Sequence, residues 1–402
     1  MSSIGNGMIL PFTIIFLTRY FHVSLAAAGT TVAIANLVAM AAGVLFGALI
    51  DRWSAVAVLV AGAAIQVVAL TCFALTTNRV AAVLALVLNA VGQGSGYPSR
   101  SSLFASLVAG RSRSRLFGLS FLLANLGSGV GSLLAAVIVR GGTRASFTTL
   151  YLLDALSFAA LLSVTLLAAR HPSVPGGVRR ASYRSDTSSG SYREAFRLPV
   201  YRLLFVLSFL LTFSSTGVLE YGIPAAAVAN SRLGTSTVAV VFLVNCAVIV
   251  AGQSVLLPVL LGRRQLVNLR LACLICVLAT VALVLTGSPA LAGLAAVLLV
   301  SVGALVAFAE IVLSPVLAPL ANDAAPEHLR GRFNAALSTS FGLAYIVAPV
   351  VATVLLGSHL GWLYLLLILA CCAAAAAIAP RVVRLAVPAV AGRDLSSEAN
   401  LA

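Results

Sequence analysis

The chain has 402 residues, of which 61% are hydrophobic and 9% charged. So little polar surface cannot cover a soluble domain of this size, so the composition excludes a soluble protein and indicates an integral membrane protein. The formal net charge is +15, but the arginines fall mainly between apolar runs. There they set membrane topology, and they do not indicate nucleic-acid binding.

Apolar runs of about 20 residues, the length that crosses a bilayer as a helix, follow one another along the chain. Their length favours helices over the alternating strands of a membrane barrel. Arg, Gly, Pro and Asn bound these runs, and they place twelve expected spans at 4–19, 28–50, 55–77, 80–106, 116–139, 146–169, 200–226, 236–261, 266–287, 291–320, 333–356 and 361–380. Because Pro11 lies so near the first residue, we expect the first helix to be truncated at its N-terminus.

A polar segment rich in Arg, Ser and Gly divides the spans into two sets of six. We therefore predict an N-terminal bundle over 1–169, a flexible linker over 170–199, a C-terminal bundle over 200–385 and a tail over 386–402. The two halves repeat, since a shift of 217 positions carries Gln93 onto Glu310, Pro98 onto Pro315, Arg115 onto Arg332 and Ser132 onto Pro349. Parallel six-helix halves of this kind form transporters, with the substrate site between them.

The distribution of arginine predicts the orientation. Nineteen of the 25 basic residues lie in the even-numbered connections, the linker and the tail, and none of the 25 is a lysine. Because basic residues stay on the cytoplasmic side, the linker and both termini are expected in the cytoplasm of a multi-pass protein of the cell membrane.

The loop after the second predicted span contains Gly47, Leu49, Asp51 and Arg52 in the order G-x-L-x-D-R. This resembles the loop signature of the major facilitator superfamily, although the second half of that signature is absent here. The resemblance implies a twelve-helix fold in which Asp51, together with Arg52, helps to latch the cytoplasmic faces of the two halves. Arg330 and Arg332 open span 11, where Asp51 is expected to dock. The alternative is an ordinary turn with a solvated ion pair.

In the fourth span, Gln93 and the glycines that follow it resemble another stretch of the same family, but the arginine of that stretch is replaced by Ala90. Gln93 is therefore a candidate for the substrate pathway. Arg100 lies seven residues later. A charge within a span faces protein or a cavity, or reaches the interface from near a helix end. Arg100 is accordingly either structural or part of the pathway.

The fifth span carries Gly118, Gly127 and Gly131 with the spacing of the family's antiporter signature. The resemblance implies antiport, but small residues at this spacing also let helix backbones approach closely, which explains the pattern by itself. Asn125, beside them, either bonds across helices or faces substrate.

Three acids lie within apolar runs: Glu310 in span 10, Asp154 in span 6 and Glu220 in span 7. An ionised carboxylate inside a bilayer is expensive, so such a residue is suited to binding and releasing a proton. Glu310 is the first candidate for proton coupling, with Asp154 and Glu220 as further ones; the alternative for each is a helix-packing hydrogen bond. Glu220 also stands where Pro224 is expected to bend the helix. By the same argument, further pathway candidates are the amides Asn36, Asn245 and Gln253.

These features predict a secondary active transporter that works by alternating access. The family resemblance favours proton-coupled export of a drug-like molecule or metabolite. A facilitator or importer of a small nutrient is the alternative within transport, and a receptor or regulator without flux is the alternative from another class. The sequence shows no nucleotide loop, nucleophile constellation or metal-ligand cluster, so we expect neither an enzyme nor a cofactor or metal. The expected partners are protons, a small molecule and lipid, with no nucleic acid, and the expected state is a monomer.

Overall fold

A computed structural model of the chain describes residues 2–107, 111–139, 142–170, 192–230, 233–261, 263–314, 316–358 and 360–386. Within these ranges all regular secondary structure is helical. The predicted tail over 386–402 lies outside the described residues apart from Ala386, and so does most of the predicted linker.

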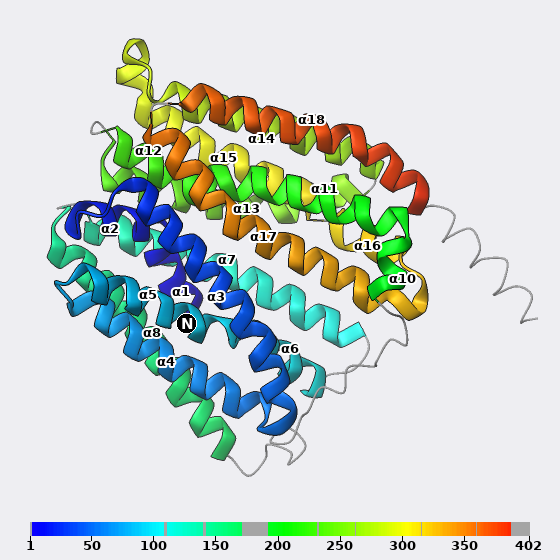
Figure 1. Ribbon diagram of the computed structural model, residues 1–402, viewed down its shortest axis with the longest axis horizontal. Coiled ribbons are helices and arrows are strands. Elements are labelled where there is room, and N and C mark those ends of the chain that lie inside the picture. The colour runs from blue at the N-terminus through cyan, green and yellow to red at the C-terminus, as the bar shows by residue number, and fades with distance from the viewer. Residues whose placement is uncertain are drawn as a thin grey trace, which may run out of the picture.

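The N-terminal half contains the elements drawn from blue to blue-green in Figure 1. They are α1 Ser2–Ile9, the 3-10 turn η1 Leu10–Phe12, α2 Thr13–Tyr20, α3 Leu25–Arg52, α4 Ala55–Leu75, α5 Arg79–Gly94, α6 Gly96–Leu107, α7 Arg111–Ile138 and α8 Arg144–Arg170. Three of these helices have an N-cap residue whose side chain accepts hydrogen bonds from backbone N–H groups of the first turn. These residues are Ser24 for α3, Ser54 for α4 and Asn78 for α5.

The C-terminal half follows from green to red in the same figure. It comprises α10 Tyr192–Arg197, α11 Pro199–Thr216, the π-helix η3 Gly217–Gly222, α12 Ile223–Ala229, α13 Thr235–Leu261, α14 Gln265–Leu285, η4 Pro289–Leu294, α15 Ala295–Leu313, α16 Leu317–Ala324, η5 Glu327–Leu329, α17 Arg330–Gly357 and α18 Gly361–Ala386.

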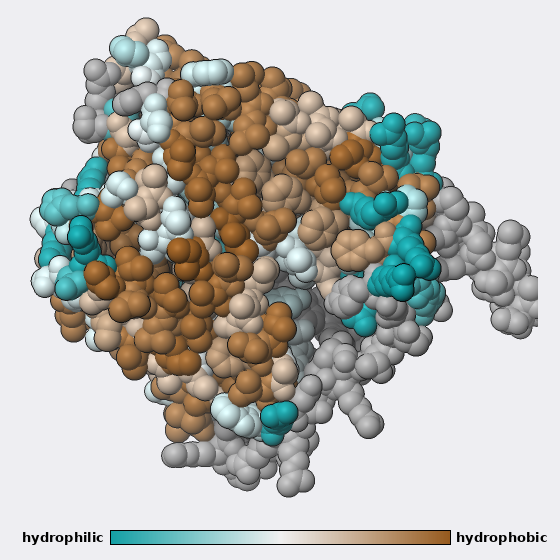
Figure 2. All heavy atoms as spheres, viewed as in Figure 1, coloured by the Kyte–Doolittle hydropathy of each residue, from teal (hydrophilic) through white to brown (hydrophobic). Residues whose placement is uncertain are grey.

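The predicted all-α membrane fold is confirmed. In the described part of the chain, ten helices have the length and composition to cross a membrane. The first and fifth predicted spans fall on α1–α2 and on α7, which supply the remaining two members of the two six-helix bundles. Figure 2 shows apolar residues over the middle of the molecule and hydrophilic residues gathered at two opposite ends, as a bilayer requires.

The two bundles repeat, with one difference from the expected register. The shift of 217 holds for α8 and α18, which begin at Arg144 and Gly361, whereas α4 and α14 are related by a shift of 210. The shift changes from 210 to 217 between α14 and α15. The segment that joins these two helices contains η4, whereas the matching segment between α4 and α5 has no such turn. The repeat therefore has one insertion of seven residues.

Two predicted spans are interrupted. The fourth breaks at Ser95, between α5 and α6, and the tenth breaks between α15 and α16. Each break lies close to one of the two prolines matched by the repeat, Pro98 and Pro315, and proline cannot donate the backbone hydrogen bond that a continuous helix needs. The interruption is thus a repeated feature of both halves.

The halves meet through α3 against α17 and α7 against α13. We call the end at which α3 and α8 finish the linker end, and the opposite end the far end. At the far end, Gly29 of α3 lies against the carbonyl oxygen of Pro349, and Leu25 lies against Gly357. The hydroxyl of Thr235 donates to the carbonyl oxygen of Val139 over 3.3 Å, joining α13 to the end of α7. The halves are therefore packed together at the far end.

The linker end differs. Met40, further along the same face of α3, still contacts Gly342, but the next residue on that face, Val44, is 73% exposed. Among the described residues, apart from the backbone of α3 itself, no atom lies within 4 Å of a Cβ built on Gly47. In Figure 1 the two halves diverge toward this end. The interface thus closes at the far end and opens toward the linker end.

Part of the predicted linker is folded. α10 packs on the C-terminal half, where Ala195 is buried and the ring of Phe196 contacts that of Tyr201. His328 and Glu194 form an exposed ion pair over 2.9 Å between η5 and α10. α8 extends to Arg170 and α11 begins at Pro199, and the division into domains at 170 and 199 stays a prediction.

The chain has two tryptophans, and they lie at opposite ends of the fold. Trp53 follows α3 at the linker end and is 61% exposed, and Trp362 begins α18 at the far end and is 59% exposed. Tryptophan favours the boundary between hydrocarbon and headgroups, so both positions suit a membrane interface.

Candidate functional site

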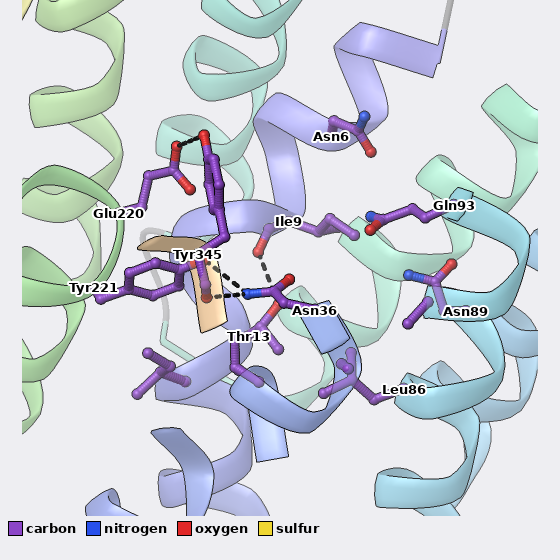
Figure 3. A pocket seen from close by; sticks show the side chains of 14 residues that line it. Asn6, Ile9, Thr13, Asn36, Leu86, Asn89, Gln93, Glu220, Tyr221 and Tyr345 are labelled. Carbon is purple, nitrogen blue, oxygen red and sulfur yellow. Dashed lines mark hydrogen bonds between the residues drawn. The ribbon is translucent and has the colours of Figure 1, made fainter. Parts of the chain in front are cut away.

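A cavity of about 250 Å³ lies between the two halves. It is lined by polar and apolar side chains from both halves, shown in Figure 3. The lining residues are Asn6, Ile9, Thr13, Ile14, Val32, Ala35, Asn36, Leu86, Asn89, Ala90, Gln93, Glu220, Tyr221 and Tyr345. We call it the first cavity.

Asn36 connects the two halves at this cavity. Its amide nitrogen, on α3, donates to the hydroxyl of Tyr221 over 3.0 Å and to the backbone carbonyl of Tyr345 over 2.7 Å (Figure 3). Because a carbonyl only accepts hydrogen bonds, the NH₂ group must face Tyr345. The amide oxygen of Asn36 is therefore the atom that remains for a ligand.

Glu220 projects from the π-helix η3. Pro224 has no N–H to donate to the carbonyl of Glu220 four residues earlier, and the N–H of Ile223 bonds to Val218, five residues back. The wider turn carries Glu220 and its neighbour Tyr221 to the first cavity together. There the hydroxyl of Tyr345 donates to Oε1 of Glu220 over 3.1 Å.

A second cavity of about 170 Å³ adjoins the first, and the two share Asn6 and Glu220. It is lined by Asn6, Gly7, Pro11, Asn125, Ser128, Ser132, Leu219, Glu220, Phe242, Asn245, Cys246, Ile249 and Glu310. The hydroxyl of Ser215 donates to Oε1 of Glu310 over 3.4 Å. The amide nitrogen of Asn245 donates to the backbone carbonyl of Gly303 over 3.1 Å, so its oxygen, like that of Asn36, remains for a ligand.

The charges at this site all have one sign. Two carboxylic acids, Glu220 and Glu310, line the cavities, and no Arg or His is among the described residues that line either one. The same part of the chain contains no group of three or more His, Cys, Asp or Glu residues that could hold a metal ion. The arrangement can bind protons or cations, and it offers no counter-charge to an anion.

The structure brings most of the predicted pathway residues together. Gln93 and Asn36 line the first cavity; Asn125, Asn245 and Glu310 line the second; Glu220 lines both. Neither set of lining residues includes Arg100, Gln253 or Asp154.

Arg100 is exposed, and its Nε donates to the carbonyl of Gly96 over 3.0 Å. Gln253 is partly buried on α13, with its side-chain oxygen unpartnered within the described structure. Asp154 is fully buried inside the N-terminal half, where Ser157 donates to its Oδ1 over 3.1 Å. Its surroundings are those of a packing contact between α8 and α1, which comes close at Gly5.

The glycine motif of the fifth span faces α1. A Cβ on Gly127 would meet Ser3, and one on Gly131 would overlap the carbonyl oxygen of Ile4. The hydroxyl of Ser132 reinforces this approach by donating to the carbonyl oxygen of Gly7 over 3.2 Å. Two of the three motif glycines thus serve close helix packing, and Gly118 lies nearer the start of the same helix, α7.

The predicted latch is described only in part. Gly47 and Arg52 lie in the last turns of α3, and Arg52 is exposed. Arg332 lies in the first turn of α17. The side chains of Asp51 and Arg330 are outside the described part of the structure, so the docking of Asp51 on span 11 stays a prediction.

The polar residues of the site that the sequence analysis did not select include the four residues Asn6, Asn89, Tyr345 and Ser215. Asn89 is 5% exposed, and its side-chain oxygen has no hydrogen-bond partner within the described structure. The repeat held a signal for one of the four, because a shift of 217 carries Ser128, in the second cavity, onto Tyr345, in the first.

Comparison with known proteins identifies the family and the fold. The model of the Major Facilitator Superfamily matches residues 1–311, and no curated protein matches the chain. A POT family transporter in complex with 5-aminolevulinic acid is 12% identical, with a TM-score of 0.76 over 95% of this chain and 94% of that one. A POT family transporter with a thioalcohol-conjugated peptide gives 13% and 0.75 over 95% and 94%. The peptide transporter POT in complex with sulfate gives 18% and 0.71 over 96% and 93%.

At these identities the solved structures establish a shared fold. The family model matches well over half of the chain, and the described helices form the two six-helix bundles that the sequence predicts. The chain belongs to the Major Facilitator Superfamily and is a membrane transporter of that type.

Proposed function

We propose that the chain is a proton-coupled secondary transporter that moves a small organic molecule by alternating access. One observation carries the proposal: the acid-lined cavities lie between halves that are packed at the far end and diverge toward the linker end. A site reached from one end at a time is what alternating access requires. With the linker in the cytoplasm, as the arginine distribution predicts, this conformation faces inward.

Glu310 is the proposed proton site. It extends from α15 toward the second cavity, where Ser215 of α11 donates to it. The titratable groups near Glu310 include Glu220 of η3, Cys246 of α13, Cys276 of α14, and Tyr345 of α17, which donates to Glu220. None of these groups supplies a permanent positive charge. A proton can therefore neutralise Glu310. The transporter can then change from one conformation to the other without keeping a bare negative charge inside the bilayer.

The test uses the full chain reconstituted in liposomes that contain a pH indicator. Amines, dipeptides and sugars are added in turn, under pH gradients of both signs, and the compound that gives the largest proton flux is taken forward. We expect Glu310→Gln to abolish transport driven by the pH gradient and to preserve exchange of that compound between the two sides. Unchanged proton dependence in this variant would rule out Glu310 as the coupling site.

Export is the direction that the glycine spacing of the fifth span implies by resemblance. Import is the second candidate, and the packing of Gly127 and Gly131 against α1 favours it, because this packing accounts for the spacing without antiport. The sign of the proton flux relative to the substrate flux distinguishes the two. Movement in opposite directions supports export by exchange, and movement in the same direction supports import.

A further inference from the structure

The first cavity presents hydrogen-bond acceptors. The amide nitrogen of Asn36 is occupied by two acceptors of the C-terminal half, so its oxygen remains. The side chain of Asn89 does not add an acceptor, because Figure 3 shows its amide nitrogen directed toward the cavity and its oxygen turned away, where it is buried. The amide oxygen of Asn36 is therefore the acceptor that a donor group of the ligand would meet.

Glu220 adds a negative charge to this acceptor. Tyr345 donates to one of its oxygens, and a carboxylate has room for further donors on the other. Figure 3 shows Glu220, Asn36 and Asn89 around one cavity, with Tyr221 and Tyr345 between the first two. Aromatic faces attract cations. Acid, acceptor oxygen and aromatic rings thus favour a ligand with positive charge and N–H donors.

Peptides fit this cavity poorly. A peptide has an amino group and a carboxylate, and recognition of the carboxylate needs a cationic partner. No Arg or His is among the described residues that line either cavity, and the chain has no lysine. Burying a carboxylate next to Glu220 and Glu310 would add repulsion to desolvation. The similar solved structures include complexes with peptides, so this chain shares their fold without the charge that a peptide carboxylate requires.

We propose that the substrate is a small organic cation with N–H donors, an alkylguanidinium or alkylammonium ion, bound by Glu220 and by the amide oxygen of Asn36. This identifies the substrate class of the transporter proposed above and rests on that function. The cation takes the place of a proton near Glu220, and its N–H groups meet the acceptors that the protein leaves open.

Four probes that share an aromatic group separate the contributions. Benzylguanidine is a permanent cation with donors, benzyltrimethylammonium is a cation without N–H donors, benzylurea is a neutral compound with donors, and the dipeptide phenylalanyl-alanine is a zwitterion. Calorimetric titration of the purified full-length protein in detergent gives each affinity. We expect benzylguanidine to bind at least about tenfold more tightly than the other three, which corresponds to ~1.4 kcal/mol.

Two variants connect the affinity to the named atoms. Glu220→Gln should weaken benzylguanidine binding by about tenfold or more and leave benzylurea binding almost unchanged, because only the charge is lost. Asn36→Leu should weaken the binding of benzylguanidine and of benzylurea alike, because it removes the amide oxygen that accepts from their N–H groups. Glu194→Gln, on the exposed face of α10, is the matched control for an acid outside the cavities.

The outcomes separate this inference from the transport proposal. If benzylguanidine does not bind the folded protein, or binds no more tightly than the dipeptide, the cation inference is wrong. Proton-dependent flux of the dipeptide would then leave the transport proposal standing. If benzylguanidine binds as expected and no compound crosses the membrane under any gradient, the binding inference stands and the transport proposal fails.

Discussion

Gly131 lies where α7 crosses α1, and a methyl group there would overlap the carbonyl oxygen of Ile4. A neighbouring residue, Gly7, makes the reciprocal approach to the backbone of Ser128. The hydroxyl groups of α7 that donate to carbonyls of α1 require the same short separation. At the scale of the residue, therefore, the glycine spacing of the fifth span is explained by backbone contact.

This contact predicts the effect of two substitutions that add the same methyl group. Gly131→Ala should destabilise the protein by about 1–3 kcal/mol, because backbone atoms must shift to admit the Cβ. Gly47→Ala should be neutral or stabilising, because no described residue outside the backbone of α3 has an atom within 4 Å of its Cβ position, and alanine favours a helix. Thermal unfolding of both variants in the same detergent measures the difference. Equal melting temperatures would show that α1 and α7 are not held this closely.

Acids at the site could be predicted from the sequence, and their neighbours could not. Glu220 and Glu310 are conspicuous because a carboxylate is unfavourable in an apolar run, whatever the fold. The same argument also selected Asp154, which is not among the described residues that line either cavity, because it does not tell which face of a helix a residue occupies. Asn89 and Tyr345 are less unusual in a membrane helix. Only their positions across the interface make them part of the site.

The π-helix η3 is the element that gives the site its shape. It places Glu220 and Tyr221, two consecutive residues, at the same cavity. In a regular α-helix consecutive residues point about 100° apart. The sequence predicted a bend near Pro224. It could not predict the π-helix, because the choice between a bend and a wider turn depends on the contacts that Tyr345 and Asn36 make with this segment.

Pro224→Ala tests the origin of this turn. The substitution restores an N–H that can bond to the carbonyl of Glu220, so the segment should become regular α-helix and rotate Glu220 away from Tyr345. We expect transport to fall several-fold while the melting temperature stays the same or rises. Transport by the proteoliposomes described above and thermal unfolding are the two measurements.

A matched control is available in the same half of the molecule. Pro289 occupies the start of η4, where a helix needs no N–H, so Pro289→Ala should leave transport unchanged. Full transport by Pro224→Ala would show that the π-helix is not needed to present Glu220. A loss in both variants would point to a general effect of removing proline.

At the scale of the whole molecule, the contacts along one face of α3 show at which end the two halves are closed. Gly29, Asn36 and Met40 on this face all contact α17. Further along, Val44 is 73% exposed, and no described residue outside the backbone of α3 comes within 4 Å of a Cβ on Gly47. The number and order of the spans could be predicted from the sequence. The end at which they close could not, because both conformations of a transporter satisfy the same apolar pattern.

The far-end contact can be locked by a disulfide. A Cβ on Gly357 would lie 3.6 Å from the Cβ of Leu25, within the range that a disulfide bridges. We expect the double variant Leu25→Cys, Gly357→Cys, made in a background with the six native cysteines replaced, to lose transport on oxidation and to recover it on reduction. Transport is measured before and after each treatment.

Each single cysteine variant serves as the control, and neither should respond to oxidant. Transport that persists after complete cross-linking would mean that the far ends of α3 and α17 need not separate. In that case the observed contact would be a fixed part of the fold, and alternating access through this interface would be contradicted.

Trp53 and Trp362 are exposed at opposite ends, so the fluorescence of each one reports on a different side of the membrane. In the variants Trp53→Phe and Trp362→Phe a single fluorophore remains, near one surface of the bilayer. An impermeant quencher such as iodide, added outside right-side-out membrane vesicles, should dim the emission of Trp362 and spare that of Trp53 if the linker is cytoplasmic. The opposite result would invert the topology that arginine predicts, so two aromatic side chains can report which face of the transporter meets the cell interior.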